Sequence, residues 1–108
     1  LGAKAALEIL ATGKLYSAPE ALNLGWVRSV VAIDELENEV FSLAETIAAN
    51  APLTVKAAKL IIKEVLKPPE KRDQKYCTAL VDACYESADC IEGQKAFREK
   101  RKPDFRGI

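Results

Sequence analysis

Apolar residues recur at helical spacing along most of this 108-residue chain, which predicts an all-α protein. Six segments carry the pattern, and polar or turn-forming residues separate them. The expected helices cover residues 2–12, 17–24, 34–49, 52–66, 70–87 and 89–101. The stretch 26–31 differs, because its β-branched residues predict a short extended segment. The predicted fold is therefore a small helical domain of four to six amphipathic helices with one short extended segment near 26–31.

Capping signals mark the starts of two early helices. Ser17 is followed three residues later by Glu20, which is the spacing of a capping box. Asp34 and Glu37 repeat that spacing. We therefore expect Ser17 to cap the second helix and Asp34 to cap the third.

The last helix leads into a basic end of the chain. Asp89 and Glu92 have capping-box spacing, so Asp89 is expected to cap this helix. Pro103 disfavours helix at the residue before it, so the helix should end near Arg101. Six basic residues stand here against three acidic ones, namely Lys95, Arg98, Lys100, Arg101, Lys102 and Arg106 against Glu92, Glu99 and Asp104.

Phe97 lies inside this basic cluster and has two interpretations. Ammonium and guanidinium groups beside an exposed aromatic ring suit a phosphorylated ligand that carries a flat ring. Alternatively, the helix is simply solvated and Phe97 packs inward. The residues alone leave both readings open.

Some apolar residues fall outside the predicted core stripes. The stripe of the fourth helix consists of Val55, Ala58, Ile62, Val65 and Leu66. Leu60 and Ile61 lie partly off it, and Phe41 lies off the stripe of the preceding helix. This leftover surface predicts either contact with another domain or subunit, or helices buried on two sides within one core.

Composition narrows the classes of function. Lysine and arginine balance aspartate and glutamate, which argues against a nucleic-acid protein driven by long-range attraction. No apolar run approaches a membrane span, and no signal peptide is visible. The three cysteines, Cys77, Cys84 and Cys90, lack metal-ligand spacing and are expected to be reduced, as in a cytoplasmic protein. No metal site and no membrane partner are expected.

Catalytic candidates are few. The chain has no histidine, which excludes His-based triads and His metal sites from it. Glu35, Glu37 and Glu39 spread around a helix start, where carboxylates favour the helix dipole, so a structural role is expected for them. The chain also lacks methionine, and Leu1 opens directly into a helical pattern. We therefore expect these residues to be a piece of a longer protein.

Three blocks of the sequence resemble the C-terminal part of the enoyl-CoA hydratase/isomerase (crotonase) family. The first reads AALEILATG at 5–13 and SAPEALNLGWV at 17–27, with Trp26 where the family usually has Leu. The second is LAETIA at 43–48, followed by Ala51-Pro52 and Lys59. The third and most specific is SAD at 87–89, then EG, AF and EKRKPDF up to Phe105. Together the blocks span almost the whole chain.

The resemblance implies that the N-terminal and C-terminal regions of the family have different roles. In the family, an N-terminal spiral of ββα units carries the oxyanion hole and the catalytic glutamates, all upstream of the position that matches Leu1. This chain, residues 1–108, would then be the C-terminal helical region, which mediates subunit assembly and covers the acyl-CoA. Phe97 and Lys100 match family positions that contact the adenine and phosphate end of coenzyme A. No residue of this chain matches a catalytic position.

The implied function is that of an enoyl-CoA hydratase-like enzyme, which adds water to 2-enoyl-CoA thioesters as a trimer or a dimer of trimers. It needs no cofactor beyond the coenzyme A of its substrate, and the 108 residues alone are expected to be inactive. Other family reactions (isomerase, dihydroxynaphthoyl-CoA synthase, decarboxylase) share this region and stay open. So does a non-catalytic helical oligomerisation module. A nucleic-acid module that uses the basic tail is the least favoured reading.

Overall fold

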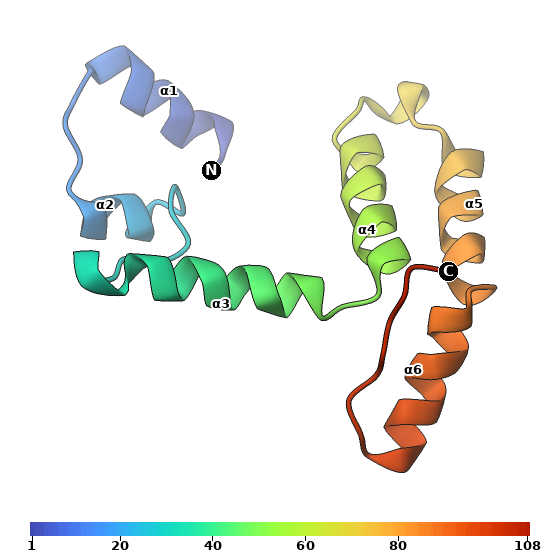
Figure 1. The fold of residues 1–108 in the computed structure, drawn as a ribbon. Helices are drawn as coiled ribbons and strands as arrows, with labels where there is room; N and C mark the ends of the chain where they lie inside the picture. The colour runs from blue at the N-terminus through green and yellow to red at the C-terminus, as the bar shows by residue number, and fades with distance from the viewer. The chain divides into compact units, whose positions relative to one another are not determined.

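The computed structural model describes all 108 residues, and it contains helices but no β-strand (Figure 1). The all-α prediction is therefore confirmed. The α-helices are α1 (Ala3–Thr12), α2 (Ala18–Asn23), α3 (Leu36–Ala48), α4 (Pro52–Val65), α5 (Gln74–Tyr85) and α6 (Ala88–Glu99). The short 3₁₀ turns are η1 (Ile33–Glu35) and η2 (Pro69–Lys71). The chain divides into two compact units, Leu1–Val40 and Phe41–Ile108, and the boundary falls within α3.

The first unit shows the predicted capping box. The Ser17 side chain accepts a hydrogen bond from the Glu20 amide, and the Glu20 carboxylate accepts from the Ser17 amide at 2.8 Å. Gly13 ends α1 in the left-handed conformation, at φ 58°, which favours glycine. These contacts fix the connection between α1 and α2.

Aromatic packing follows in the same unit. The rings of Tyr16 and Trp26 meet edge to face, with centroids 6.3 Å apart. The Lys14 ammonium lies 4.9 Å from the centroid of the Tyr16 ring. The segment 26–31, expected to be extended, bends from Trp26 to Arg28 and then continues without regular secondary structure.

Two predicted helix starts are wrong. Asp34 lies inside the 3₁₀ turn η1 and does not act as a side-chain cap. Glu70 lies inside η2, and α5 begins only at Gln74. Asp73 caps α5 instead, because its carboxylate accepts from the Tyr76 amide at 2.8 Å. Pro68 precedes η2 and Pro69 is its first residue, and α5 begins only after this turn.

In the second unit, α4 packs along α5, and α5 contacts α6 (Figure 1). The face of α4 that is buried differs from the predicted stripe. Ala57 and Glu64 are the buried residues of α4, whereas Ile62 and Val65 are 60% and 55% exposed. Because Ala57 has a small side chain, the backbone of α4 can approach its neighbour closely there. The larger residues of the predicted stripe, Ile62 and Val65, therefore face outward.

An apolar cavity of about 410 Å³ lies between α4, α5 and the start of α6. Ala58 and Ile61 line it from α4, and Val81 and Tyr85 line it from α5. Only two apolar residues, Ala57 and Ala96, are buried.

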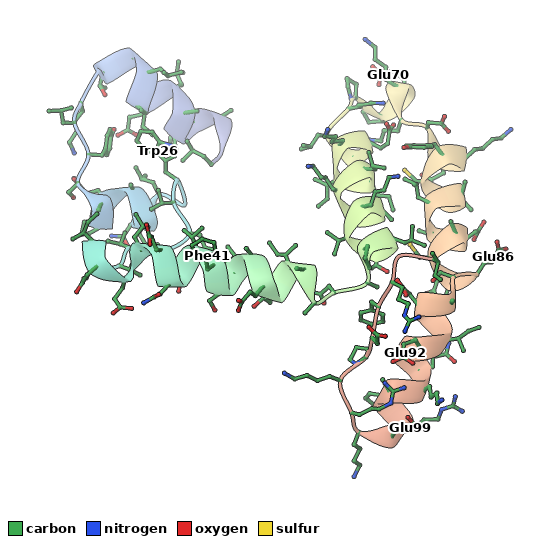
Figure 2. All side chains as sticks on the ribbon, in the orientation of Figure 1. Trp26, Phe41, Glu70, Glu86, Glu92 and Glu99 are labelled. Carbon is green, nitrogen blue, oxygen red and sulfur yellow. The ribbon has the colours of Figure 1, made fainter.

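Large apolar side chains are exposed in both units. Trp26 is 52% exposed in the first unit, and Phe41 is 65% exposed in the second (Figure 2). Apolar exposure on this scale is typical of surfaces that contact another domain or subunit.

Candidate ligand-binding end of helix α6

Helix α6 begins with a cap that the sequence did not predict. Ser87 Oγ accepts from the Cys90 amide at 3.1 Å and donates to the Cys84 carbonyl at 2.6 Å. Ser87 is therefore the cap, and the prediction that Asp89 caps this helix is wrong. Asp89 lies within the first turn, and its amide donates to the Ile108 carbonyl rather than pairing with Glu92.

The helix ends at Glu99, two residues before the predicted end. Lys100 adopts the left-handed conformation, with φ 53° and ψ 38°. Its amide donates to the Phe97 carbonyl at 3.3 Å, and the Arg101 amide donates to the Ala96 carbonyl at 3.1 Å. This pair of bonds is a Schellman motif, in which glycine usually occupies the position of Lys100. The chain reverses direction at that lysine.

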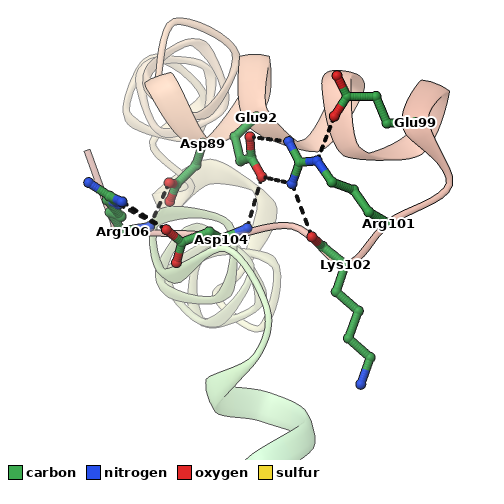
Figure 3. Close-up of polar contacts among 7 residues, drawn as sticks. All are labelled: Asp89, Glu92, Glu99, Arg101, Lys102, Asp104 and Arg106. Atoms are coloured by element: carbon green, nitrogen blue, oxygen red, sulfur yellow. Dashed lines mark hydrogen bonds and ion pairs between the residues drawn. The ribbon is translucent and has the colours of Figure 1, made fainter.

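After the reversal, Arg101 returns to the side of α6 (Figure 3). Its two terminal nitrogens contact the two oxygens of the Glu92 carboxylate, at 2.6 and 2.9 Å. Its Nε donates to Glu99 at 2.6 Å. Glu92 also accepts from the Asp104 amide at 2.9 Å. One carboxylate thus holds both a guanidinium and the backbone that follows it.

Residues 101–108, here called the C-terminal strap, run back along α6 to its first turn (Figure 1). The buried carboxylate of Asp89 accepts from the amides of Arg106 and Gly107 at 2.7 and 2.8 Å. Asp89 and Glu92 are three residues apart, so they lie on one face of the helix. They hold the strap at two points, one helical turn apart.

Packing supports these polar contacts. The ring of Phe105 lies over Gly93, where a Cβ atom would come within 3.4 Å of the ring. Gly107 has φ +77° and lies beside the Pro52 side chain. Glycine therefore suits both positions, one for close approach and one for backbone conformation.

The network lowers the pKa of Glu92. The hydrogen bonds from Arg101, and then from the Asp104 amide, lower that pKa from 4.5 to about 2. The same pairing, together with Glu99, raises the pKa of Arg101. Glu92 and Arg101 are therefore both charged at neutral pH, and the guanidinium of Arg101 is already paired with the carboxylates of Glu92 and Glu99.

The two residues selected from the sequence lie together at the end of α6. Phe97 is 86% exposed, so the alternative that it packs inward is wrong for this chain. Lys100 is exposed as well and takes part in none of the ion pairs of the structure. The paired residues of the basic cluster are Arg101, with Glu92 and Glu99, and Arg106, with Asp104.

Sequence analysis missed the roles of Asp89 and Glu92 in holding the strap. The signal was present, because Pro103 and Gly107 mark a chain that turns and returns after a helix.

Glu35 and Glu39 make separate contacts, with Asn38 and Arg28, and do not converge on a common site. No group of three or more His, Cys, Asp or Glu side chains is placed to hold a metal ion, and none of the helices has the length and apolarity to cross a membrane. All three cysteines are free.

Comparison with known proteins adds independent information. Residues 1–107 match the family model described as enoyl-CoA hydratase/isomerase. The chain is 36% identical over 100 residues to enoyl-CoA hydratase EchA19 of Mycobacterium tuberculosis, covering 93% of this chain and 38% of that protein. It is also 36% identical over 104 residues to carnitinyl-CoA dehydratase of Salmonella paratyphi B, covering 93% of this chain and 40% of that protein.

Solved structures give the same result. Enoyl-CoA hydratase EchA1 of Mycobacterium marinum superposes with a TM-score of 0.85 at 34% identity, covering 97% of this chain and 42% of that one. An enoyl-CoA hydratase/carnithine racemase of Magnetospirillum magneticum gives a TM-score of 0.83 at 38% identity, covering 99% and 39%. The chain thus spans about two fifths of the length of these relatives.

Proposed function

Because this chain belongs to the enoyl-CoA hydratase/isomerase family, we propose that it is the C-terminal helical region of an enzyme that adds water to 2-enoyl-CoA thioesters. The region contributes subunit assembly and coenzyme A binding, and it carries no catalytic residue. The observation that carries the proposal is the exposed pair of Phe97 and Lys100 at the end of α6.

The chemistry of this pair suits the nucleotide end of coenzyme A. An exposed phenyl ring offers a stacking surface for adenine, and base–aromatic stacking is worth about 1–3 kcal/mol. An ammonium group without a carboxylate partner is available to a phosphate oxygen. Arg101 is less suited to that task, since its guanidinium already contacts Glu92 and Glu99.

Binding at this end would support a reaction that takes place elsewhere on the substrate. Contacts with a remote, non-reacting part of a substrate supply energy for positioning the reacting centre. In the proposed hydration, the thioester oxygen gains negative charge and fixed amide donors stabilise it. Those donors belong to the part of the enzyme that these 108 residues do not include. We therefore expect the isolated chain to be inactive, and the proposal involves no cofactor other than the coenzyme A of the substrate.

The exposed apolar residues favour assembly. Val65 and Leu66 at the end of α4 are 55% and 81% exposed, and Phe41 in α3 is 65% exposed. Side chains of this size gain about 1.5–3 kcal/mol each on burial, so they favour contact with further protein. A homo-oligomer, either a trimer or a dimer of trimers, is the assembly that we propose, in a cytoplasmic enzyme whose cysteines stay reduced.

Two alternative functions are supported by specific observations. The likeness to a carnitinyl-CoA dehydratase favours another reaction on a CoA thioester within the same family. The scarcity of buried apolar residues favours, for the isolated chain, a non-catalytic helical module that oligomerises.

The test is an assay of the natural protein, purified from its source, with a series of 2-enoyl-CoA thioesters. Loss of the conjugated double bond with formation of a 3-hydroxyacyl-CoA supports the proposal. Migration of the double bond without hydration supports an isomerase instead. Failure to turn over any CoA thioester, combined with self-association in light scattering, supports the helical module.

A further inference from the structure

We propose that Glu92 and Arg101 are positioning residues for coenzyme A, because their ion pair fixes the chain reversal that holds Lys100 at the exposed end of α6. This inference rests on the proposed contact between Lys100 and coenzyme A. In it, neither Glu92 nor Arg101 touches the ligand, and both act through Lys100.

The backbone of Lys100 explains why a clamp is needed. A side chain with a Cβ disfavours the left-handed conformation that Lys100 adopts. Such a conformation persists when the surrounding structure holds it in place. Without that support, the chain after Glu99 would sample other directions, and the ammonium group would not stay in one place.

Arg101 provides the support on both sides of Lys100. Its Nε contacts Glu99, the residue before Lys100, at 2.6 Å. One terminal nitrogen donates to the carbonyl of Lys102, the residue after Lys100, at 3.1 Å. The two terminal nitrogens also contact Glu92, about two turns before the end of α6 at Glu99, so the reversal is tied to the body of the helix.

The guanidinium group is suited to this task. Its planar fork donates to two carboxylate oxygens at once and still has Nε–H for a third partner. Lysine has a compact ammonium group without the planar fork, so it cannot reproduce the bidentate contact with Glu92. A direct role of Arg101 in phosphate binding is disfavoured, since Glu92 and Glu99 neutralise its charge and occupy three of its five N–H donors.

The experiment is a double-mutant cycle in the natural protein. Arg101→Gln and Glu92→Gln are each made with Lys100 present and with Lys100→Ala. Dissociation constants are measured for butyryl-CoA and for S-butyryl-pantetheine, which lacks the nucleotide. With Lys100 present, we expect each substitution to weaken butyryl-CoA binding roughly fivefold and to leave pantetheine binding unchanged. With Lys100→Ala, the same substitutions should cause no further loss, because positions that act through one group are not additive.

Glu64→Gln is the matched control. Glu64 also accepts from a cationic side chain, Lys67, and from a backbone amide, that of Asp73. It lies in the last turn of α4, remote in sequence from Lys100. We expect Glu64→Gln to lower the thermal midpoint without changing the ratio of the two dissociation constants.

The outcomes separate the two proposals. If Lys100→Ala itself leaves that ratio unchanged, the proposed contact with coenzyme A fails. If Lys100→Ala changes the ratio but Arg101→Gln does not, or if their effects simply add, the positioning role is overturned. Should Arg101→Gln fail to fold, Arg101→Lys keeps the charge without the fork; an intermediate ratio supports the proposal, and a ratio equal to that of the unmodified protein overturns it.

Discussion

Arg101 and Glu92 lie nine residues apart in the sequence, yet two hydrogen bonds of 2.6 and 2.9 Å join the two ends of the guanidinium to the two carboxylate oxygens. This fork-to-fork contact closes a loop that contains the end of α6, the left-handed Lys100 and the start of the strap. Charged, bidentate hydrogen bonds are among the stronger polar contacts in proteins. The local order of the candidate site therefore depends on charged groups more than on a large apolar core.

The first prediction concerns the pH dependence of stability. The pKa of Glu92 is lowered from 4.5 to about 2 on folding, so the carboxylate stabilises the folded chain above about pH 4.5. That contribution should be lost as the pH falls from 4.5 toward 2. We expect Glu92→Gln to be less stable than the unmodified chain at pH 7, with a difference that shrinks across this window.

Urea denaturation at several pH values measures that difference. Glu20 has a similarly lowered pKa of about 2 and retains it in both proteins, so its contribution cancels in the comparison. A difference in unfolding free energy that stays constant from pH 7 to pH 2 would contradict the role assigned to Glu92.

The second prediction concerns the start of α6. Ser87→Ala removes both the acceptor for the Cys90 amide and the donor to the Cys84 carbonyl. Loss of such a cap costs about 1 kcal/mol, with a range of roughly 0.5–2 kcal/mol. Ser42→Ala, at an exposed position inside α3, serves as the control and should be close to neutral. Equal urea midpoints for the two variants would show that Ser87 is not the cap.

The third prediction concerns the contact between Gly93 and Phe105. A Cβ atom added at position 93 would lie 3.4 Å from the Phe105 ring, so the longer side chain of Gly93→Leu should displace that ring. We expect faster hydrogen exchange at the strap amides of Asp104 and Arg106, which donate to Glu92 and Asp89. Gly2→Leu, where no atom lies within 4 Å of the added Cβ, should leave both amides unchanged. Unchanged exchange in Gly93→Leu would show that this ring does not hold the strap.

The fourth prediction is that one substitution at Lys100 raises stability and weakens ligand binding. Lys100→Gly relieves the left-handed conformation at φ 53° and should stabilise the chain by about 0.5–1 kcal/mol. The same change removes the ammonium group and should weaken coenzyme A binding. Thermal unfolding and a binding titration of one sample test both parts, and a loss of stability would contradict the strain assigned to Lys100.

The sequence predicts contacts between residues close together in the chain better than contacts between distant ones. The capping box of Ser17 and Glu20 spans three residues, and the pattern alone was enough to predict it. Asp89 and Glu92 show the same spacing, yet neither forms a capping box. Both carboxylates instead accept hydrogen bonds from the strap, whose amides and guanidinium lie between nine and eighteen residues away in the sequence. Local spacing cannot distinguish these outcomes, because a returning chain competes for the same acceptors.

The prediction of which face of α4 is buried was wrong for a related reason. Periodicity selected the face with Ile62 and Val65, the larger side chains, whereas the helix packs through Ala57 and Glu64. Glu64 is buried because Lys67 and the Asp73 amide satisfy its carboxylate. Hydrophobic periodicity cannot predict a buried charge that is satisfied in this way. The exposed Phe97 was foreseen only as one of two options, because periodicity does not show which neighbours cover a side chain.

The measurement that tests the central claim most directly is the effect of Lys100→Ala on ligand selectivity in the natural protein. Titration calorimetry would give dissociation constants for butyryl-CoA and for S-butyryl-pantetheine. Loss of one charge-assisted contact should weaken butyryl-CoA binding roughly tenfold and leave pantetheine binding unchanged. Equal effects on the two ligands, or none on either, would show that the end of α6 does not bind the nucleotide of coenzyme A.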